Sequence, residues 1–246
     1  MCKNLAPMTK ATSNTGNSAL GPRKRRLQKR AEETTGKIRI AAMRLFSECG
    51  YDGATIRDIE NAAGVKRGLV SHHFGTKEKL WKAILEQIFG LLREYLDART
   101  EQLKDLPPSQ QAAEVISSYV RFNAAHPELT RLMVHEGKRD TARLRFIVDT
   151  YSRPLMKQLR QSVGVWIDED NDDFVFWYYT FLGAGSLVYV MAPEAQSMFG
   201  FNGRDSSSVD RHANFVVDFL VHRGLAKQTV TAQQAPAKNG GKKAKK

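Results

Sequence analysis

The amino-acid sequence predicts an all-α fold, in which a small N-terminal helical domain is joined by one long helix to a larger C-terminal helical domain. Apolar residues recur at three- and four-residue spacing wherever a period is clear, and no segment combines sustained alternation with turn signals. The 246 residues are 41% hydrophobic, which is enough for a substantial buried core. These observations favour a chain built of helices alone.

The first folded helix is predicted to begin near Thr34 or Thr35. Its apolar residues follow the i, i+3, i+4, i+7, i+8 pattern of a helix face that packs on a core. They are Ile38, Ala41, Ala42, Leu45 and Phe46. Gly50 follows the last of them and is predicted to stop the helix.

Residues 55–80 predict two short helices joined by a tight glycine turn. Thr55 can cap the first helix, and an aspartate three residues later favours its N-terminus. Gly64 ends this helix, because glycine takes a left-handed backbone conformation without steric cost. In the second helix Val70 and Phe74 lie one turn apart on the buried side. The residues left facing outward are Lys66, Arg67, Gly68, Leu69, Ser71, His72 and His73. A rigidly held helix with such a surface is suited to the major groove of DNA.

This stretch resembles the DNA-binding domain of the tetracycline-repressor (TetR) family of bacterial transcriptional regulators. The similarity is close over residues 38–82, and elsewhere it extends only to length and helical character. The matching residues, in order, are Leu45, Phe46, Gly50, Tyr51, Thr55, Ile59, Ala63, Gly64, Val65, Gly68, His73, Phe74, Lys77, Glu78 and Leu80. The resemblance implies a homodimeric repressor that binds a palindromic double-stranded DNA operator and is released by a small-molecule effector.

Two positions depart from the family pattern. Lys66 stands where the family usually has a small hydroxyl residue, so a normal cap of the recognition helix is replaced by a cation beside the DNA. Ser71 stands where an aromatic residue is usual, so a frequent phosphate-contacting phenol is absent. The operator sequence therefore does not follow from relatives.

The predicted DNA contacts divide into base contacts and phosphate contacts. Arg67 can form two hydrogen bonds with a guanine, and Leu69 can touch a thymine methyl group. By resemblance, four more side chains face phosphate or the groove, namely Thr55, Lys66, His73 and Lys77. The full predicted set is Thr55, Lys66, Arg67, Gly68, Leu69, Ser71, His72, His73 and Lys77. The alternative interpretation is an ordinary solvated helical hairpin.

Beyond this region the sequence predicts a long helix from Thr76 to about Arg99, which would link the two domains mechanically. The later helices are predicted over residues 109–125, 129–136, 141–163 with a kink at Pro154, 174–192 and 208–222. The predicted organisation is a disordered basic tail at 1–33, a helix-turn-helix DNA-binding domain at 34–82, a helical effector-binding and dimerisation domain at 83–226, and a disordered Lys-rich tail at 227–246.

The formal net charge of +12 belongs to the two ends of the chain. Residues 1–37 contain nine Lys or Arg and two Glu, while residues 227–246 contain six Lys and no acid. Segments of this kind bind polyanions through counterion release. The run Arg23-Lys24-Arg25-Arg26 is interpreted as an arm that enters the minor groove, with a merely solvated tail as the alternative.

Residues 174–192 form a run of 19 residues without a charge. Its length alone would admit a membrane span, but its tyrosines, glycines, Thr180 and Ser186 favour a helix buried on all sides, and no membrane association is expected. By resemblance, this helix and the last one pack against their copies in a homodimer. The predicted interface residues are Phe174, Trp177, Phe181, Gly183, Ala184, Val188, Ala213, Val216, Val217 and Leu220.

A small-molecule effector is expected among the helices that span residues 109–163. The predicted lining residues are Tyr119, Phe122, Asn123, Met133, Phe146, Ile147, Tyr151 and Trp166. Such an aromatic-rich lining suits an apolar or amphipathic molecule, although an aromatic stripe at helical spacing is also typical of an ordinary core. Effector binding would favour one setting of the long helix and one separation of the two DNA-reading heads.

The sequence predicts no catalysis, no metal site and no cofactor. No nucleophile elbow, phosphate loop or Ser/His/Asp order stands out. Asp168, Asp170 and Asp172 have the spacing of a calcium loop without its glycine and closing glutamate. Adjacent residues such as His72 and His73 do not face one point on a helix.

Two rival functions stay open: an architectural DNA-binding protein that uses its basic tails without sequence preference, and a soluble enzyme or ligand carrier with an incidental helical hairpin. The expected localisation is the bacterial cytoplasm, on the nucleoid when the protein is bound.

Overall fold

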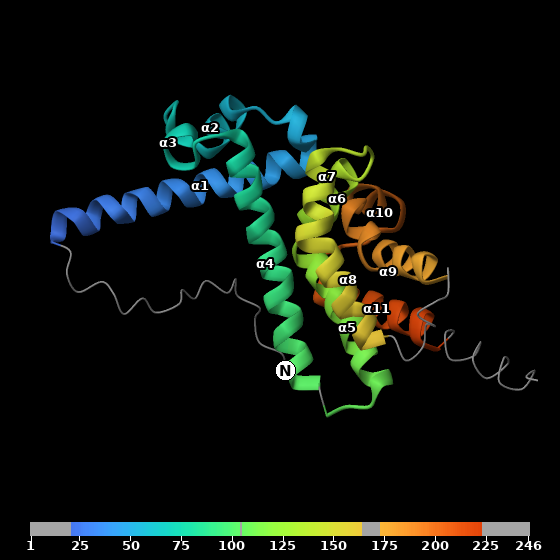
Figure 1. The fold of residues 1–246 in the computed structure, drawn as a ribbon. Coiled ribbons are helices and arrows are strands. Elements are labelled where there is room, and N and C mark those ends of the chain that lie inside the picture. The colour runs from blue at the N-terminus through green and yellow to red at the C-terminus, as the bar shows by residue number, and fades with distance from the viewer. Residues whose placement is uncertain (1–20, 104, 164–172, 223–246) are drawn as a thin grey trace, which may run out of the picture.

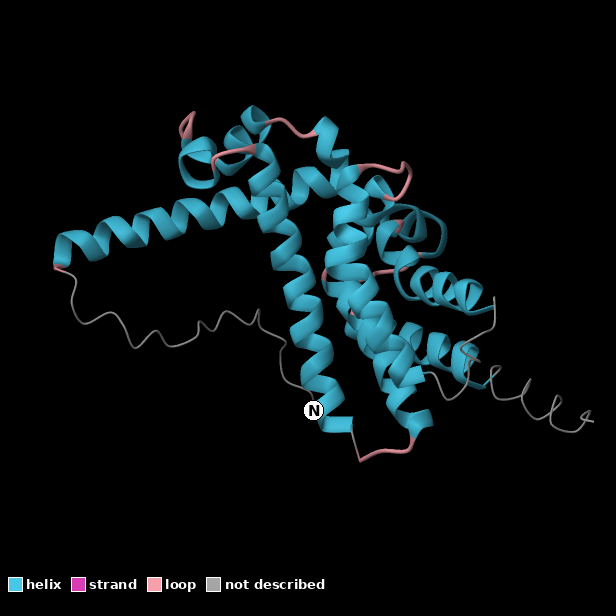
Figure 2. Cartoon of the chain, in the orientation of Figure 1, coloured by secondary structure: helices cyan, strands magenta, loops and turns pink. Residues whose placement is uncertain are grey.

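The computed structural model describes residues 21–103, 105–163 and 173–222, and every regular element within these ranges is a helix (Figures 1 and 2). The predicted all-α class is therefore confirmed. The elements are α1 (Pro22–Gly53), α2 (Ile56–Ala63), α3 (Leu69–Phe74), α4 (Lys77–Leu103), α5 (Pro108–Ala125), α6 (Glu128–Glu136), α7 (Ala142–Ile147), η2 (Val148–Ser152), α8 (Arg153–Val163), α9 (Asp173–Val190), α10 (Ala192–Phe199), α11 (Ser206–Val217) and η3 (Asp218–His222).

Helix α1 begins at Pro22, so residues 22–33 are helical where the sequence predicted a disordered tail. Pro22 lies in the first turn, where its missing N–H removes no hydrogen bond from the helix. Thr34 and Thr35, near which the helix was predicted to start, lie inside it and donate their hydroxyls to carbonyls one turn earlier. The prediction was wrong for residues 22–33 because it gave weight to their charge, whereas Arg, Lys, Leu, Gln, Ala and Glu are all good helix formers.

Glycines with positive φ divide the N-terminal region, and three of them bear on the predicted helix boundaries. Gly50 (φ 70°) interrupts α1 and Gly64 (φ 62°) ends α2, as the sequence predicts. Gly68 has φ 85°, so it cannot belong to a right-handed helix, and α3 begins one residue later. Lys66 and Arg67, which were expected on the recognition helix, therefore lie in the turn before it.

Two hydrophobic clusters form the core. The larger one joins residues of α1–α4 to residues of α5, α6, α7 and η2, so it continues across position 82 without interruption. Trp81 is buried in this cluster, and its ring lies 6.2 Å from that of Phe146. The smaller cluster joins α5 to α9 and α11. Helix α5 thus packs on α4 and also on α9 and α11.

The helix predicted over residues 141–163 is divided in the structure. Helix α7 is followed by the π-helical turn η2, and α8 begins directly after it. Pro154, the second residue of α8, has no N–H to donate to a carbonyl one turn earlier. The wider π turn lies where that hydrogen bond would fall, which accounts for the predicted irregularity at Pro154.

The charge-free run is also divided, because α9 ends at Val190 and α10 begins at Ala192 with Pro193 in its first turn. Within the described ranges, no single helix combines the length and apolar character needed to cross a membrane. Helices α9 and α10 meet that requirement only when taken together, and they are bent by 72° at the break between them.

Candidate nucleic-acid interface

Helix α3 is held against α2 by a buried carboxylate. Glu60 is 3% exposed, and its Oε1 accepts the backbone N–H of Val70 at 3.1 Å. This N–H lies in the first turn of α3, where backbone donors have no partner within the helix and a negative charge is favourable. Val70 is itself fully buried, so its side chain and this hydrogen bond together fix α3. Sequence reasoning missed Glu60, whose signal was an acid just before the glycine turn.

Thr55 caps α2, as the sequence predicts. Its hydroxyl accepts the N–H of Asp58 at 3.1 Å and donates to the Asp58 carboxylate at 2.5 Å. At the other end of α2, the N–H of Gly64 donates to the Asn61 carbonyl at 3.1 Å. The helix is therefore closed at both ends by bonds within the same short segment, and the hydroxyl of Thr55 is engaged in the cap.

The predicted DNA-contact residues around α3 lie mostly at the surface. Ser71 and His72 are exposed on the helix, while His73 is half-buried with its ring 5.0 Å from that of His72. Leu69 is also half-buried and packs on the larger core cluster. We call the exposed group the reading surface, and it consists of Lys66, Arg67, Gly68, Ser71 and His72.

Lys77 occupies the first position of α4, as the sequence predicts, but its ammonium group faces an aromatic ring. Its Nζ lies 4.4 Å from the centroid of Tyr51, and the guanidinium carbon of Arg143 lies 4.4 Å from the same centroid. Burial lowers the pKa of Lys77. The ring face attracts both cations, so the side chain of Lys77 belongs to the contact between α4, α1 and α7.

Arg143 completes a charged cluster at this contact. Its guanidinium donates to the Glu136 carboxylate at 3.0 and 3.3 Å and to the Asp52 carboxylate at 3.1 Å. Desolvation works against the charge of Arg143, but its hydrogen bonds and charge interactions with the two acids raise its pKa overall. Because the Glu136 side chain is buried, water screens its pair with Arg143 only weakly.

We call this cluster the Tyr51 junction, and it consists of Tyr51, Asp52, Lys77, Glu136 and Arg143. It joins α1 and α4 of the N-terminal region to α6 and α7 of the helical domain. The backbone of α1 also lies close to a side chain of α6 here, since a Cβ added at Gly50 would lie 3.1 Å from Nδ1 of His135. Sequence reasoning missed the junction because its members are far apart in the chain.

Among the residues that the structure describes, no group of three or more His, Cys, Asp and Glu side chains is arranged to hold a metal ion. The acidic run that contains Asp168, Asp170 and Asp172 lies outside the described residues.

The predicted effector-lining residues are divided between the two core clusters. Five of them belong to the larger cluster: Phe122, Met133, Phe146, Ile147 and Tyr151. Tyr119 belongs to the smaller cluster, where its ring lies 4.5 Å from that of Phe181. Trp166 lies outside the described residues. The structure therefore brings these side chains into two packed groups on either side of α5.

A small polar cluster lies between these groups. Asn123 is fully buried, donates to the Tyr119 carbonyl at 2.9 Å and accepts the Thr130 hydroxyl at 2.8 Å. Burial raises the pKa of the Tyr119 phenol to about 12, although hydrogen bonds from neighbouring groups oppose the shift. In η2, the Tyr151 hydroxyl donates to the Glu86 carboxylate at 3.0 Å. These buried polar atoms are paired within the chain.

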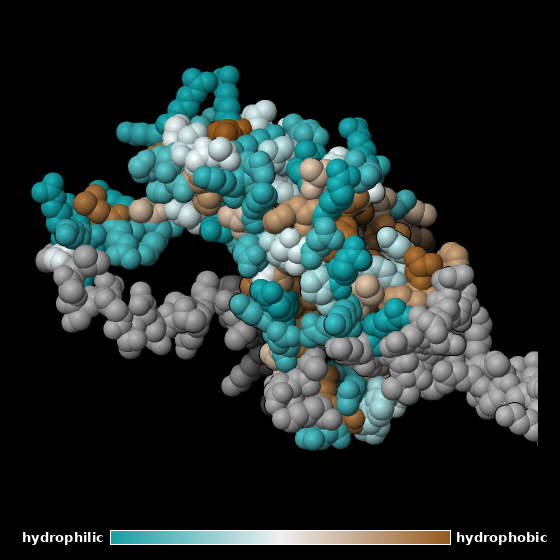
Figure 3. Space-filling view, viewed as in Figure 1, coloured by the Kyte–Doolittle hydropathy of each residue, from teal (hydrophilic) through white to brown (hydrophobic). Residues whose placement is uncertain are grey.

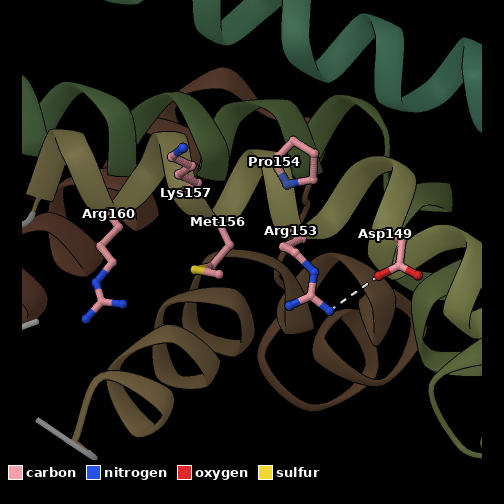
Figure 4. Close-up of a pocket in the computed structure, with 6 residues that line it drawn as sticks. All are labelled: Asp149, Arg153, Pro154, Met156, Lys157 and Arg160. Atoms are coloured by element: carbon pink, nitrogen blue, oxygen red, sulfur yellow. Dashed lines mark hydrogen bonds and ion pairs between the residues drawn. The ribbon is translucent and has the colours of Figure 1, made fainter. Parts of the chain in front are cut away.

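A surface groove of about 490 Å³ runs along α8 (Figure 4). Its lining residues are Asp149, Arg153, Pro154, Met156, Lys157 and Arg160. None of the seven predicted effector-lining residues that the structure describes borders it. Figure 4 shows Arg153 and Asp149 on its wall, where Arg153 donates to Asp149 at 3.3 Å.

Four of the ten predicted dimer-interface residues are covered within the subunit. They are Phe181, Ala213, Val216 and Leu220. All four belong to the smaller core cluster with residues of α5, so they are core residues of one subunit and present no surface to a second. The assignment of Phe181 was wrong because α9 is apolar on every side, and its pattern could not distinguish an inner face from an outer one. The assignment of Ala213, Val216 and Leu220 was wrong because the apolar side of α11 and η3 packs on α5 of the same subunit.

The other six predicted interface residues are half-buried: Phe174, Trp177, Gly183, Ala184, Val188 and Val217. Several exposed large apolar side chains of α9, α11 and η3 were not predicted, among them Phe176, Tyr179 and Leu187 of α9, Phe215 of α11 and Phe219 of η3. Gly185, which follows two of the predicted interface residues, faces the interior of the same subunit. A Cβ there would lie 2.7 Å from the Tyr119 ring, so Gly185 allows α9 to approach α5.

Residues 38–84, which include α2, α3 and the turn between them, match the family model described as bacterial regulatory proteins, tetR family. The N-terminal region of the chain is a TetR-family DNA-binding region. The HTH-type transcriptional regulator CymR of Pseudomonas putida is 42% identical over 85 residues, which are 35% of this chain and 42% of CymR. The match therefore spans less than half of CymR's length.

Other relatives extend over more of this chain at lower identity. The HTH-type transcriptional repressor NicS of Pseudomonas putida is 24% identical over 207 residues, which are 79% of this chain and 93% of NicS. The transcriptional regulator FadR of Bacillus subtilis, solved in complex with stearoyl-CoA, has a TM-score of 0.54 and 18% identity over 75% of this chain and 96% of FadR. The likeness to FadR shows a shared fold for the helical domain as well as the N-terminal region.

Proposed function

We propose that this chain is a TetR-family transcriptional repressor that binds a palindromic operator and leaves it when a small-molecule effector binds. The observation that carries the proposal is the reading surface, which exposes Lys66, Arg67, Ser71 and His72 on a short helix and turn braced by Glu60. A braced helix of this kind enters the major groove and contacts base edges. The names of CymR and NicS support this role. A repressor of this kind acts in the bacterial cytoplasm, on the DNA.

The proposal includes a homodimer formed by the outward sides of α9 and α11. Phe176, Tyr179 and Leu187 follow one side of α9, and Gly183 between them has open space above its backbone. Phe215 on α11 and Phe219 on η3 are exposed, and the inner side of α11 packs with α9 in the smaller core cluster. Large apolar side chains gathered on neighbouring helices favour burial against another surface. A twofold axis through this face would present two copies of α3 to a palindrome.

The effector site is proposed in the helical domain, close to the polar cluster of Asn123, Thr130 and Tyr119. Pockets for small molecules are mostly apolar with a few polar groups that orient the ligand, and this cluster lies between two apolar cores. An apolar or amphipathic molecule that parts these helices could exchange their internal hydrogen bonds for its own. FadR, with stearoyl-CoA bound, is a protein of this fold that holds such a molecule.

The Tyr51 junction is the proposed path from the effector to the DNA. Helix α7 carries Arg143 at the junction, and it also carries Phe146 and Ile147 among the predicted effector-lining residues. A ligand that shifts α7 would change the contacts of Arg143 with Asp52 and Glu136. Since Asp52 belongs to α1, the change would reach the region that holds α3.

Selection of bound fragments from the source organism's DNA tests the DNA-binding part. The expected result is a short palindrome whose half-sites lie about one helical turn apart. Replacement of Arg67 by Ala should reduce discrimination at one base pair by about 1–3 kcal/mol. Lys138→Ala, at an exposed position between α6 and α7, is the matched control. Equal binding to every duplex at near-physiological salt would contradict the proposal.

A thermal-shift screen tests the effector part. A compound that stabilises the chain is expected to weaken operator binding as well, because the two sites share the Tyr51 junction. Arg143→Met should reduce this effect on DNA while the compound still binds. A compound that stabilises the protein and leaves operator affinity unchanged would contradict the coupling.

A further inference from the structure

The N-terminal part of α1 carries exposed charges that lie outside the reading surface. Residues 23–30 contain six Lys or Arg and no acid, and all of them are exposed. Figure 1 shows this part of α1 projecting away from the other helices at the end of the molecule that carries α2 and α3. In Figure 3 the projecting part is largely hydrophilic. We call residues 23–30 the basic rod.

The charges of the basic rod oppose its helical form. Arg23, Arg26 and Arg30 are spaced by three and four residues, so they lie on one side of the helix, where like charges repel. The rod also lies near the N-terminus of α1, which is the end of a helix that disfavours cations. Neither core cluster includes a residue of the rod. A helix segment without packing is only marginally stable, so neutralising these charges would stabilise it.

The rod continues from a part of α1 that contacts α3. The guanidinium carbon of Arg39, further along α1, lies 5.5 Å from the ring centroid of Phe74, the last residue of α3. At 1.5 Å per residue, Arg30 and Arg23 lie about 14 Å and about 24 Å from Arg39 along the helix axis. Both distances are shorter than one turn of B-DNA, which is about 34 Å long.

We propose that the basic rod binds the phosphate backbone of DNA beside the operator, and that the charge of the DNA stabilises its helical form. The position of the DNA in this inference rests on the proposed function of the reading surface. The rod has six cations to set against closely spaced phosphates, which is the charge complementarity that drives sequence-independent DNA binding.

The helical form of the rod replaces the earlier expectation of a minor-groove arm at these residues. The minor groove of B-DNA is about 6 Å wide, whereas a helix with its side chains is about 10–12 Å across. Residues 23–30 therefore cannot enter that groove as a helix. Contacts to phosphate carry no sequence information, so the rod adds affinity and salt dependence and leaves the choice of operator to the reading surface.

The test compares two triple variants of the full chain. The rod variant carries Arg23→Gln, Arg26→Gln and Arg30→Gln, and the control variant carries Lys138→Gln, Arg139→Gln and Lys157→Gln. Both lose three exposed positive charges, but the control loses them from the helical domain. Affinity for a duplex of about 40 base pairs without a palindrome is measured between about 50 and 200 mM salt.

The rod variant is expected to reduce the slope of log affinity against log salt by about 2 to 3, and the control is expected to leave it unchanged. Equal slopes for the two variants would overturn the proposal. So would binding to vesicles of anionic lipid that the rod variant abolishes while its DNA slope stays at the control value, because the rod would then serve a membrane surface.

Circular dichroism gives an independent reading. Duplex DNA should increase the helix content of the wild-type chain and leave that of the rod variant unchanged, because glutamine removes the repulsion that the DNA would relieve. An equal increase in both would overturn the link between charge and helix. If the rod variant changes the salt slope but Arg67→Ala does not change sequence preference, the proposed function is rejected and the proposal for the rod stands. If Arg67→Ala changes sequence preference but the rod variant leaves the salt slope unchanged, only the proposal for the rod is rejected.

Discussion

The turn between α2 and α3 and the long helix α9 are specified by their sequences in opposite ways. Around the turn, glycines with positive φ, the threonine that caps the start of α2 and the contrast between polar and apolar residues leave each side chain one favourable place. Helix α9 offers no such contrast. Phe181 is 3% exposed and Phe176 is 69% exposed, although they are the same residue on the same helix. The sequence predicts whether a residue is buried or exposed when one of the two placements is energetically costly. When every side of a helix is apolar, the neighbouring helices decide which residues are buried.

The regions also differ in how they connect. The predicted boundary at residue 82 separates two sequence patterns, but the larger core cluster contains residues from both sides of it. The N-terminal region is therefore recognisable by its local sequence, while its stability depends on contacts with the helical domain.

Among the substitutions that test this comparison, replacement of Trp81 by Ala should have the largest effect on stability. The side chain is buried between Tyr51 and Phe146, so the free energy of unfolding should fall by about 3–5 kcal/mol. Urea unfolding followed by circular dichroism and by tryptophan fluorescence, to which Trp177 of α9 contributes, should show one shared transition at lower urea. Two separate transitions would mean that the regions unfold independently despite their common core.

The two sides of α9 should respond differently to substitution. Phe181→Ala should lower the free energy of unfolding by about 3 kcal/mol, because it leaves a cavity between α9 and α5. Phe176→Glu should leave the fold of the subunit intact and dissociate the proposed dimer. Analytical ultracentrifugation and urea unfolding of both variants check this. A dimeric Phe176→Glu protein would show that the outward side of α9 is not the interface.

The Tyr51 junction should be stronger than an exposed ion pair. A double-mutant cycle with Arg143→Met and Glu136→Gln should give a coupling energy of about 1.5–3 kcal/mol, since the carboxylate is buried. The exposed pair of Arg145 and Asp140, with an N–O distance of 2.5 Å, is the matched control. Its cycle should give at most about 1 kcal/mol. Equal coupling in both cycles would remove the energetic argument for the junction.

Acidification should have the smallest effect, and it concerns the helical domain. Burial lowers the pKa of His126 and of His212 from their ordinary value of 6.5. The unfolded chain therefore binds more protons than the folded chain below pH 6.5, and the free energy of unfolding falls as the pH decreases through that range. The loss is at most about 1.4 kcal/mol per pH unit for each histidine.

Urea unfolding at about pH 7.5 and about pH 5.5 measures this loss, and the double variant His126→Gln, His212→Gln should show less of it. His212 also bonds the Tyr189 hydroxyl at 2.9 Å, so the variant is compared with itself at the two pH values. If the double variant shows the same pH dependence as the wild-type chain, groups other than these two histidines cause the loss.

Much of the N-terminal region was predictable from its sequence. The helix breaks at Gly50 and Gly64 and the Thr55 cap are confirmed, because each depends on residues within one turn of the chain. The start of α3 was misplaced because a positive φ at Gly68 is a property of the folded turn. Glu60 was missed because its partner, Val70, belongs to another helix.

By itself, the sequence determined the helical class, the place of the DNA-binding region and the short-range turns and caps within it. Only the tertiary structure decided which side of α9 packs on α5, that the ammonium of Lys77 faces Tyr51, and that Asp52 and Arg143 meet across 91 positions. The physical reason is range: caps and turns arise from bonds between close neighbours in the chain, whereas the direction of a buried side chain depends on helices that only folding brings together.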